Sequence, residues 1–141
     1  MDMLIAALLG QILGIVLWTA VLYTPVLQWR TRVRFNWHLP YKRAFLVAIK
    51  AAGMALVVSM LLGFVAGATG LLGPGVDGVI FLAGIIAWWY THTTGVLKES
   101  ESETLISLRD ARFLSAGVMA WSFGIALVIG LTIGLAITLL A

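Results

Sequence analysis

The segment that decides the fold is WTAVLYTPVLQWRTRVRFNWHLPYKR, which runs from Trp18 to Arg43. It joins the end of an apolar run to the densest cluster of positive charge in the chain. Pro25 removes a backbone donor and disfavours helix for the residue before it, so we expect the first helix to end near Leu27. Lys and Arg accumulate in the cytoplasmic loops of membrane proteins. We therefore predict that the loop after this helix is cytoplasmic and that its orientation signal is Arg30, Arg32, Arg34, Lys42 and Arg43.

The composition is that of a membrane protein. The chain has 141 residues, of which 62% are hydrophobic and 11% are charged, whereas a soluble domain is about 45–50% apolar and about 25% charged. Four apolar runs each reach the roughly 20 residues that a helix needs to span a bilayer. The sequence predicts an all-α integral membrane protein, a single four-helix bundle domain over residues 1–141. The expected helices are at about 3–27, 41–68, 79–97 and 101–141, and the expected cytoplasmic loops are at 28–40 and 98–112.

Local signals suggest where two of these helices begin. The Gly and Pro density of residues 70–78 predicts a turn. Asp77 then reads as the N-cap of the third helix, and a point where protons or cations enter is the alternative. Ser100 and Glu103 match a capping box for the fourth helix. On this interpretation the solvated capping charges are Glu99, Glu101 and Glu103.

The distribution of charge predicts the orientation. The loop before the fourth helix carries Lys98, Arg109 and Arg112, whereas the two termini and the 70–78 turn carry no Lys or Arg. The positive-inside rule then places both basic loops in the cytoplasm and both termini outside a bacterial-type inner membrane. The N-terminal Met-Asp-Met lacks the basic region of a cleaved signal peptide, so we do not expect one. Because the positive charge serves as an orientation signal, no nucleic-acid partner is expected.

Small residues and tryptophans are expected to separate across the membrane. Pairs of the Gly-xxx-Gly type let helix backbones approach closely in lipid, and this chain has three: Gly10 with Gly14, Gly63 with Gly67, and Gly130 with Gly134. All three fall in the expected outer half, whereas all six tryptophans fall in the expected cytoplasmic half. We therefore predict helices that meet at the outer face and are held apart at the inner face. The rings then form either an interfacial belt or the wall of an inner-half cavity or partner-docking surface.

Four residues are candidates for such a cavity: Lys50, Tyr23, His92 and Trp88. Lys50 is the only charge well inside an apolar run, so it either snorkels to the cytoplasmic headgroups or faces an anionic ligand, a lipid phosphate or Tyr23. His92 would need a second group to hold haem or a metal, and the chain offers neither cysteine nor a carboxylate in an apolar core. We expect a structural histidine that is hydrogen-bonded among Thr91, Thr93 and Thr94, with no metal and no cofactor.

The segment from Leu22 to Leu27, Leu-Tyr-Thr-Pro-Val-Leu, is similar to the Trp-Tyr-Ser-Pro-Leu-Leu motif of a family of small four-helix bacterial membrane proteins of unknown function. Leu22 stands where that family has tryptophan, Trp18 lies four residues earlier, and the glycine and lysine that follow the family motif are missing. The resemblance implies a compact four-helix membrane protein and implies no activity.

These observations favour a structural or accessory subunit that packs through its glycine-rich helix faces. The expected partners are membrane lipid and either further copies of the chain or a larger membrane complex. A small-solute carrier or channel with a cytoplasm-facing aromatic cavity is the first alternative, and a membrane enzyme acting on lipid or quinone is the second. We do not expect an enzyme, because no serine lies in a Gly-x-Ser-x-Gly elbow and no phosphate-binding glycine loop is present.

Overall fold

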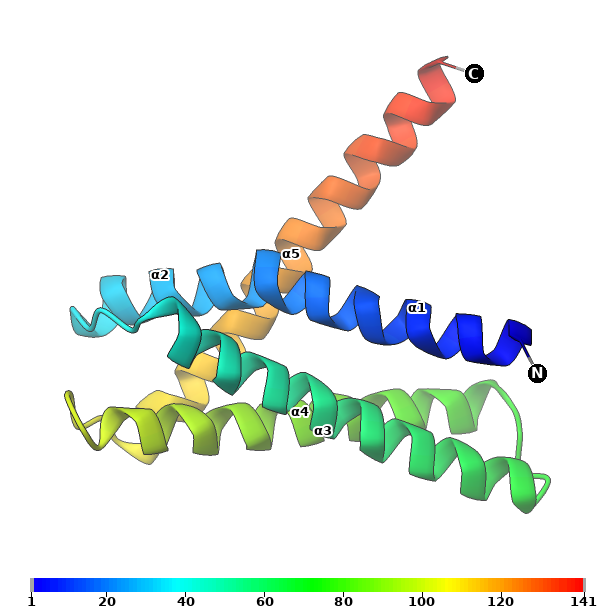
Figure 1. Cartoon of the computed structure of the whole chain (residues 1–141), viewed down its shortest axis with the longest axis horizontal. Coiled ribbons are helices and arrows are strands. Elements are labelled where there is room, and N and C mark those ends of the chain that lie inside the picture. The colour runs from blue at the N-terminus through cyan, green and yellow to red at the C-terminus, as the bar shows by residue number, and fades with distance from the viewer. Residues whose placement is uncertain (1, 141) are drawn as a thin grey trace.

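The computed structural model describes residues 2–140, and every regular element in that range is helical. Four helical segments are long and apolar enough to cross a membrane, so the chain is an all-α, multi-pass membrane protein. Its elements are α1 (Asp2–Trp18), the π-helical turn η1 (Thr19–Tyr23), α2 (Thr24–Phe35), α3 (Tyr41–Ala68), α4 (Pro74–Ser100) and α5 (Leu108–Leu140). In Figure 1, α3 and α4 run side by side as a hairpin, and α5 crosses obliquely.

The first membrane helix does not end at Pro25, so the expected end near Leu27 is wrong. α1, η1 and α2 form one helical segment of 34 residues from Asp2 to Phe35. The chain accommodates proline by widening into a π turn, in which both the amide and the hydroxyl of Thr24 donate to the carbonyl of Thr19. In a π turn each main-chain hydrogen bond joins residues five apart instead of four, and this shift accommodates the donor that proline lacks. The helix therefore continues into the arginine-rich segment.

The loop that follows is correspondingly shorter than expected. α2 ends where Asn36 adopts a left-handed conformation with φ of 51°, so the connection covers residues 36–40 instead of 28–40. At about 1.5 Å per residue, the 34-residue helix is about 51 Å long and exceeds a hydrocarbon core of roughly 30 Å. Arg30, Arg32 and Arg34 thus lie on a helical extension of the first span.

The last two helices also begin at other residues than expected. α4 begins at Pro74, so Asp77 lies within its first turn and is not its N-cap. α5 begins at Leu108 instead of Glu101, and the expected capping box is wrong. The cap is Ser107, whose hydroxyl accepts the amide of Asp110 at 3.1 Å and donates to its carboxylate at 2.9 Å. Ser100 instead donates to a carbonyl of its own helix.

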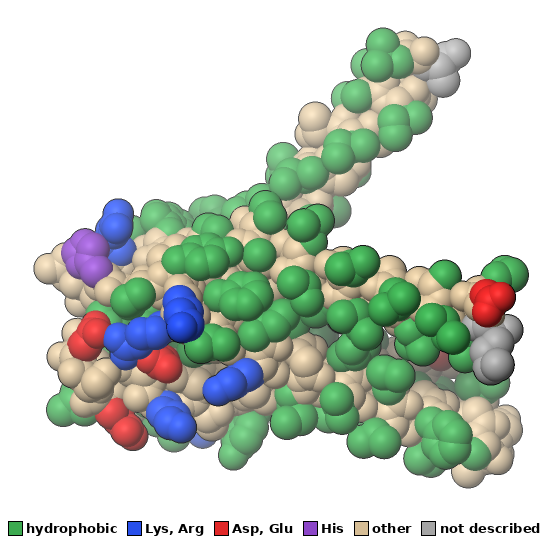
Figure 2. Space-filling view, in the orientation of Figure 1, with side chains coloured by type: hydrophobic (Ala, Val, Ile, Leu, Met, Phe, Trp, Pro, Cys, Tyr) green, Lys and Arg blue, Asp and Glu red, His purple; other side chains and the backbone are tan. Residues whose placement is uncertain are grey.

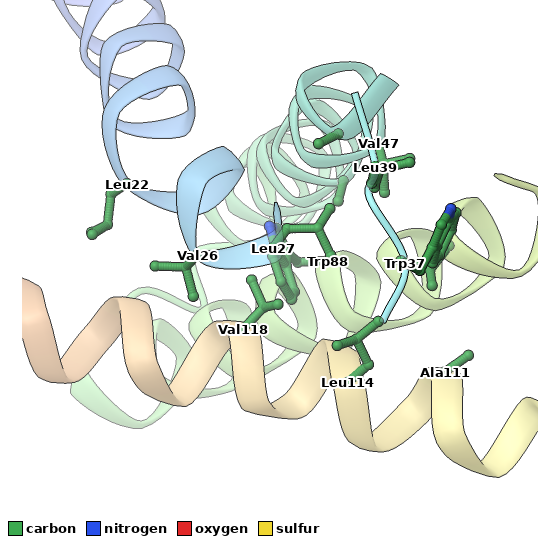
Figure 3. Packing of buried hydrophobic residues seen from close by; sticks show 13 residues of the cluster. Leu22, Val26, Leu27, Trp37, Leu39, Val47, Trp88, Ala111, Leu114 and Val118 are labelled. Atoms are coloured by element: carbon green, nitrogen blue, oxygen red, sulfur yellow. The ribbon is translucent and has the colours of Figure 1, made fainter. Parts of the chain in front are cut away.

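The hydrophobic core lies in the half of the bundle nearest the charged loops. Figure 2 shows the charged side chains gathered mainly at one end of the molecule. In Figure 3, Leu27 of α2 and Val118 of α5 lie close to Trp88 of α4, and Trp37 comes from the loop before α3. The other core side chains are Leu22, Val26, Leu39, Ala44, Val47, Ala51, Val96, Ala111 and Leu114.

The opposite half of the bundle is splayed, which reverses the predicted taper. α1 contains no buried residue, and every side chain of α5 from position 127 to position 140 is exposed. Figure 1 shows the C-terminal half of α5 projecting away from the other helices. A Cβ atom built on any glycine of the three Gly-xxx-Gly pairs would meet nothing within 4 Å. These glycines therefore do not hold the helices of one chain together.

The close helix approaches occur at other glycines. A Cβ on Gly84 of α4 would lie 2.6 Å from the Ser59 hydroxyl of α3, and one on Gly95 would lie 3.0 Å from Val47. A Cβ on Gly117 of α5 would lie 2.6 Å from the Arg30 guanidinium. On α3 the Ala55 carbonyl and the Ser59 hydroxyl lie beside Gly84, and the buried residues of this helix include Ala44, Ala48 and Ala51. Small residues on both helices thus permit the tight α3–α4 hairpin.

Candidate functional site

Two of the predicted cavity residues do come together. The rings of Tyr23 and Trp88 lie 5.5 Å apart, and both line a cleft of about 540 Å³ between η1, α1, α3, α4 and α5. Trp88 in turn stacks on His92, with ring centroids 4.5 Å apart and planes tilted by 17°. Trp88, the middle ring of the three, is only 5% exposed, so the packing of the core holds it in place.

The cleft lies away from the charged loops, and not in the half of the bundle where the sequence predicted that Tyr23 and Trp88 would line a cavity. Its α3 wall runs from Ala52 to Ser59, which is about 16–27 Å along the helix from its start at the charged end. The walls are mostly apolar, and the lining side chains that contain a polar atom are Gln11, Trp18, Thr19, Tyr23, Ser59 and Trp88. No carboxylate, amine, guanidinium or imidazole lines it. The cleft therefore offers apolar and aromatic contact but no acid–base pair.

His92 is fully buried beneath Trp88 and does not open onto the cleft. Its Nδ1 shares a hydrogen bond of 2.7 Å with the Ser115 hydroxyl of α5, and its Nε2 is without a partner. His92 is hydrogen-bonded, but the expected partners are wrong: Thr94 bonds to its own helix and the Thr93 hydroxyl is buried without a partner. The imidazole therefore joins α4 to α5.

Lys50 stands apart from the other three candidates. Its side chain is exposed on α3 and does not line the cleft. The three side chains thus lie in different environments. Lys50 is on the exposed surface of the bundle, Tyr23 lines the cleft, and His92 is in the closed core. The carrier hypothesis required them to share one interior space, so the geometry removes the main argument for it.

The two charged loops are tied together by a cluster that the sequence did not reveal. Arg43 of α3 pairs with Glu99 at 2.5 Å and with Glu103 at 2.5 Å, so these two glutamates are not simply solvated capping charges. Trp37 is only 2% exposed, and its indole donates to Glu103 at 2.7 Å. The Trp37 indole first, and the Arg43 guanidinium second, hold the pKa of the Glu103 carboxyl below its ordinary value.

A related contact supports the π turn. The Tyr41 hydroxyl at the start of α3 donates to the Ala20 carbonyl at 2.7 Å. Ala20 precedes Pro25 by five residues, so in the π register its carbonyl faces a nitrogen without a proton. Tyr41 supplies the donor that proline cannot, and it therefore links the bend in the first helix to the second. Sequence alone indicated the break at Pro25 but carried no signal for this partner.

Within residues 2–140, no group of three or more His, Asp or Glu side chains is arranged to hold a metal ion. No protein-family model matches the chain, and comparisons with curated proteins and with solved structures likewise gave no match. The case for a function therefore depends on the geometry alone.

Proposed function

We propose that this protein is a structural or accessory subunit of a bacterial-type inner membrane, and that it assembles with other copies of itself or with a larger membrane complex. It is not an enzyme on this proposal. The single observation that supports it is the unpartnered outer half of the bundle, where α1 has no buried residue and the end of α5 projects from the other helices.

The glycine pairs fit this role. In lipid there is little hydrophobic drive between apolar helix faces, so close backbone approach at small residues becomes important. Gly10 on α1, and Gly130 and Gly134 on α5, have open space around them within the chain, and Gly14 lines the cleft. A helix of a neighbouring chain can approach these backbones closely. The faces that were expected to pack within the chain are thus proposed to pack between chains.

The proposal is tested by lengthening side chains on one face of α5. Gly130→Leu with Gly134→Leu fills the glycine face, whereas Thr132→Leu with Ala136→Leu adds bulk about half a turn away on the same exposed helix. Native mass spectrometry of the detergent-extracted protein should show assemblies for the wild type and for the Thr132/Ala136 control. Assemblies of the glycine variant should be weaker, so that they dissociate to monomers at a protein concentration about tenfold higher than those of the wild type do. A monomeric wild type at every detergent concentration, or equal loss in both variants, contradicts the proposal.

The orientation belongs to the same proposal and has its own test. The chain contains no cysteine, so one can be introduced at exposed Leu105 near the charged end or at exposed Leu72 near the opposite end. A membrane-impermeant maleimide should label Leu72→Cys in intact cells and should label Leu105→Cys only after lysis. The reverse pattern would place the basic loops outside.

A further inference from the structure

A second pocket lies at the charged end of the molecule, remote from the cleft. It has a volume of about 470 Å³ between α4 and α5, and it is lined by Trp89, Leu108, Arg109, Arg112, Phe113 and Ala116. None of these residues lines the Tyr23–Trp88 cleft. The pocket thus combines two guanidinium groups with apolar and aromatic walls.

The two arginines have no carboxylate partner in the described part of the chain, where Arg43 alone among the Lys and Arg side chains forms ion pairs. The nearest acid in sequence, Asp110, accepts a hydrogen bond from Ser107. The Arg109 guanidinium lies over the Phe113 ring, 5.8 Å from its centroid. Two positive charges are therefore held in one pocket without internal neutralisation.

The position of the pocket matches the boundary between headgroups and hydrocarbon. Arg109 and Arg112 lie in the first turns of α5, directly after the loop at residues 101–107, and the apolar run of the helix begins at Phe113. Leu108 and Phe113 are exposed beside the arginines. The Trp89 indole donates to the Arg112 carbonyl at 3.1 Å and fixes the aromatic wall from α4. A ligand here meets positive charge at one level and apolar side chains at the next.

We propose that this pocket binds the headgroup of an anionic phospholipid, with its phosphate between Arg109 and Arg112 and an acyl chain along Phe113. Guanidinium groups match phosphate oxygens in geometry and charge. Basic pockets between membrane helices bind anionic headgroups on this principle. Charge complementarity selects an anion, and the exposed apolar wall selects a lipid over free phosphate. The inference does not depend on the proposed subunit role.

The test uses the full chain and a matched pair of double variants. Arg109→Gln with Arg112→Gln removes two charges from the pocket, whereas Arg32→Gln with Arg34→Gln removes two charges from α2, outside the pocket. Native mass spectrometry after equilibration with phosphatidylglycerol or phosphatidylcholine measures retained lipid. The pocket variant should retain phosphatidylglycerol with roughly 10- to 30-fold lower affinity, and the α2 variant should remain within about twofold of wild type.

Three results would overturn the proposal. Equal losses in both double variants would indicate diffuse surface charge. Equal retention of phosphatidylcholine by the wild type would indicate an apolar groove without headgroup selection. Displacement of phosphatidylglycerol by millimolar inorganic phosphate would indicate a site for free anions.

A second measurement needs no arginine substitution. Trp89 emission, taken as the difference between the wild type and Trp89→Phe, should be quenched more strongly by brominated phosphatidylglycerol than by brominated phosphatidylcholine. Equal quenching by the two lipids overturns the proposal even if the glutamine variants fail to fold.

Discussion

Two buried serines on one helix should differ in how much stability the chain loses when each is replaced with alanine. Ser115 and Ser122 both lie on α5 and are 0% and 1% exposed. The Ser115 hydroxyl bonds to His92 at 2.7 Å, whereas the Ser122 hydroxyl has no partner. Replacing either serine with alanine deletes the same oxygen from a similar environment. The two variants therefore isolate the hydrogen bond from the change in volume.

The expected magnitudes follow from what each alanine leaves behind. Hydrogen bonds between membrane helices contribute about 0.6 kcal/mol on average and at most about 1.7 kcal/mol. Ser115→Ala also leaves both nitrogens of the buried His92 ring without partners, which places its cost near the upper end, at about 1–2 kcal/mol. Ser122→Ala removes a hydroxyl that is already unpaired, so its effect should stay within about 0.5 kcal/mol.

The free energy of unfolding can be measured by steric trapping in bicelles or by reversible unfolding in mixed micelles. A third variant completes the argument: His92→Phe with Ser115→Ala removes both polar groups, keeps a ring against Trp88, and should be more stable than Ser115→Ala alone by about 1 kcal/mol. If Ser115→Ala and Ser122→Ala cost the same, or if the double variant is the least stable, the His92–Ser115 bond does not join α4 to α5 as described.

Three further predictions concern the bend, the helix hairpin and the loops. Tyr41→Phe should lower the free energy of unfolding by about 0.5–1.5 kcal/mol, and by less in a Pro25→Ala background that restores a main-chain donor. Gly84→Leu should destabilise the α3–α4 hairpin by about 1–3 kcal/mol in the same unfolding assay, whereas Gly63→Leu should be nearly neutral. Because the folded pKa of Glu103 is lowered, its stabilisation is complete above the ordinary value of about 4.3 and is lost as the pH falls through the folded value. Glu103→Gln should therefore flatten the acid-induced loss of stability.

Each of these has a contrary outcome. If Tyr41→Phe lowers the free energy of unfolding equally with and without Pro25→Ala, the Tyr41 hydrogen bond does not compensate for the donor that proline lacks. Equal costs at Gly84 and Gly63 would mean that the two glycines face similar space. A pH dependence that Glu103→Gln leaves unchanged would assign the acid sensitivity to other carboxylates.

The sequence predicted the class of fold because four long apolar runs have few alternatives in a bilayer. It misplaced the helix ends for identifiable physical reasons. Pro25 reads as a stop because it lacks a donor, but the π turn and the Tyr41 hydroxyl satisfy the main chain around it. Ser100 and Glu103 carry a capping pattern, but Glu103 is occupied by Trp37 and Arg43 from other parts of the chain. Local patterns could not reveal these distant partners.

The choice of glycines was the larger error. Gly-xxx-Gly pairs are conspicuous, yet the close approaches involve single glycines: Gly84 lies against Ser59, Gly95 against Val47 and Gly117 against Arg30. The useful signal was the alanine spacing on α3, where Ala44, Ala48, Ala51 and Ala55 make one side of the helix small. A pair of glycines indicates that a close approach is possible, and only the partner face decides whether it occurs within the chain.

The helices are close together near the charged loops and apart at the opposite end because the contacts that stabilise helix association in lipid lie near the loops. Apolar faces gain little by leaving lipid for one another, so helices associate where small residues and polar bonds meet. Those features lie mainly in the half nearest the charged loops: the alanine face of α3, the His92–Ser115 bond, and the Arg43 cluster that joins the loops. The opposite half offers large aliphatic side chains and open glycines. The segment from Trp18 to Arg43 contributes to cohesion through Trp37, Tyr41 and Arg43, and its arginines carry the orientation signal that we propose. The glycine faces of the opposite half remain available for the neighbouring chain that we propose.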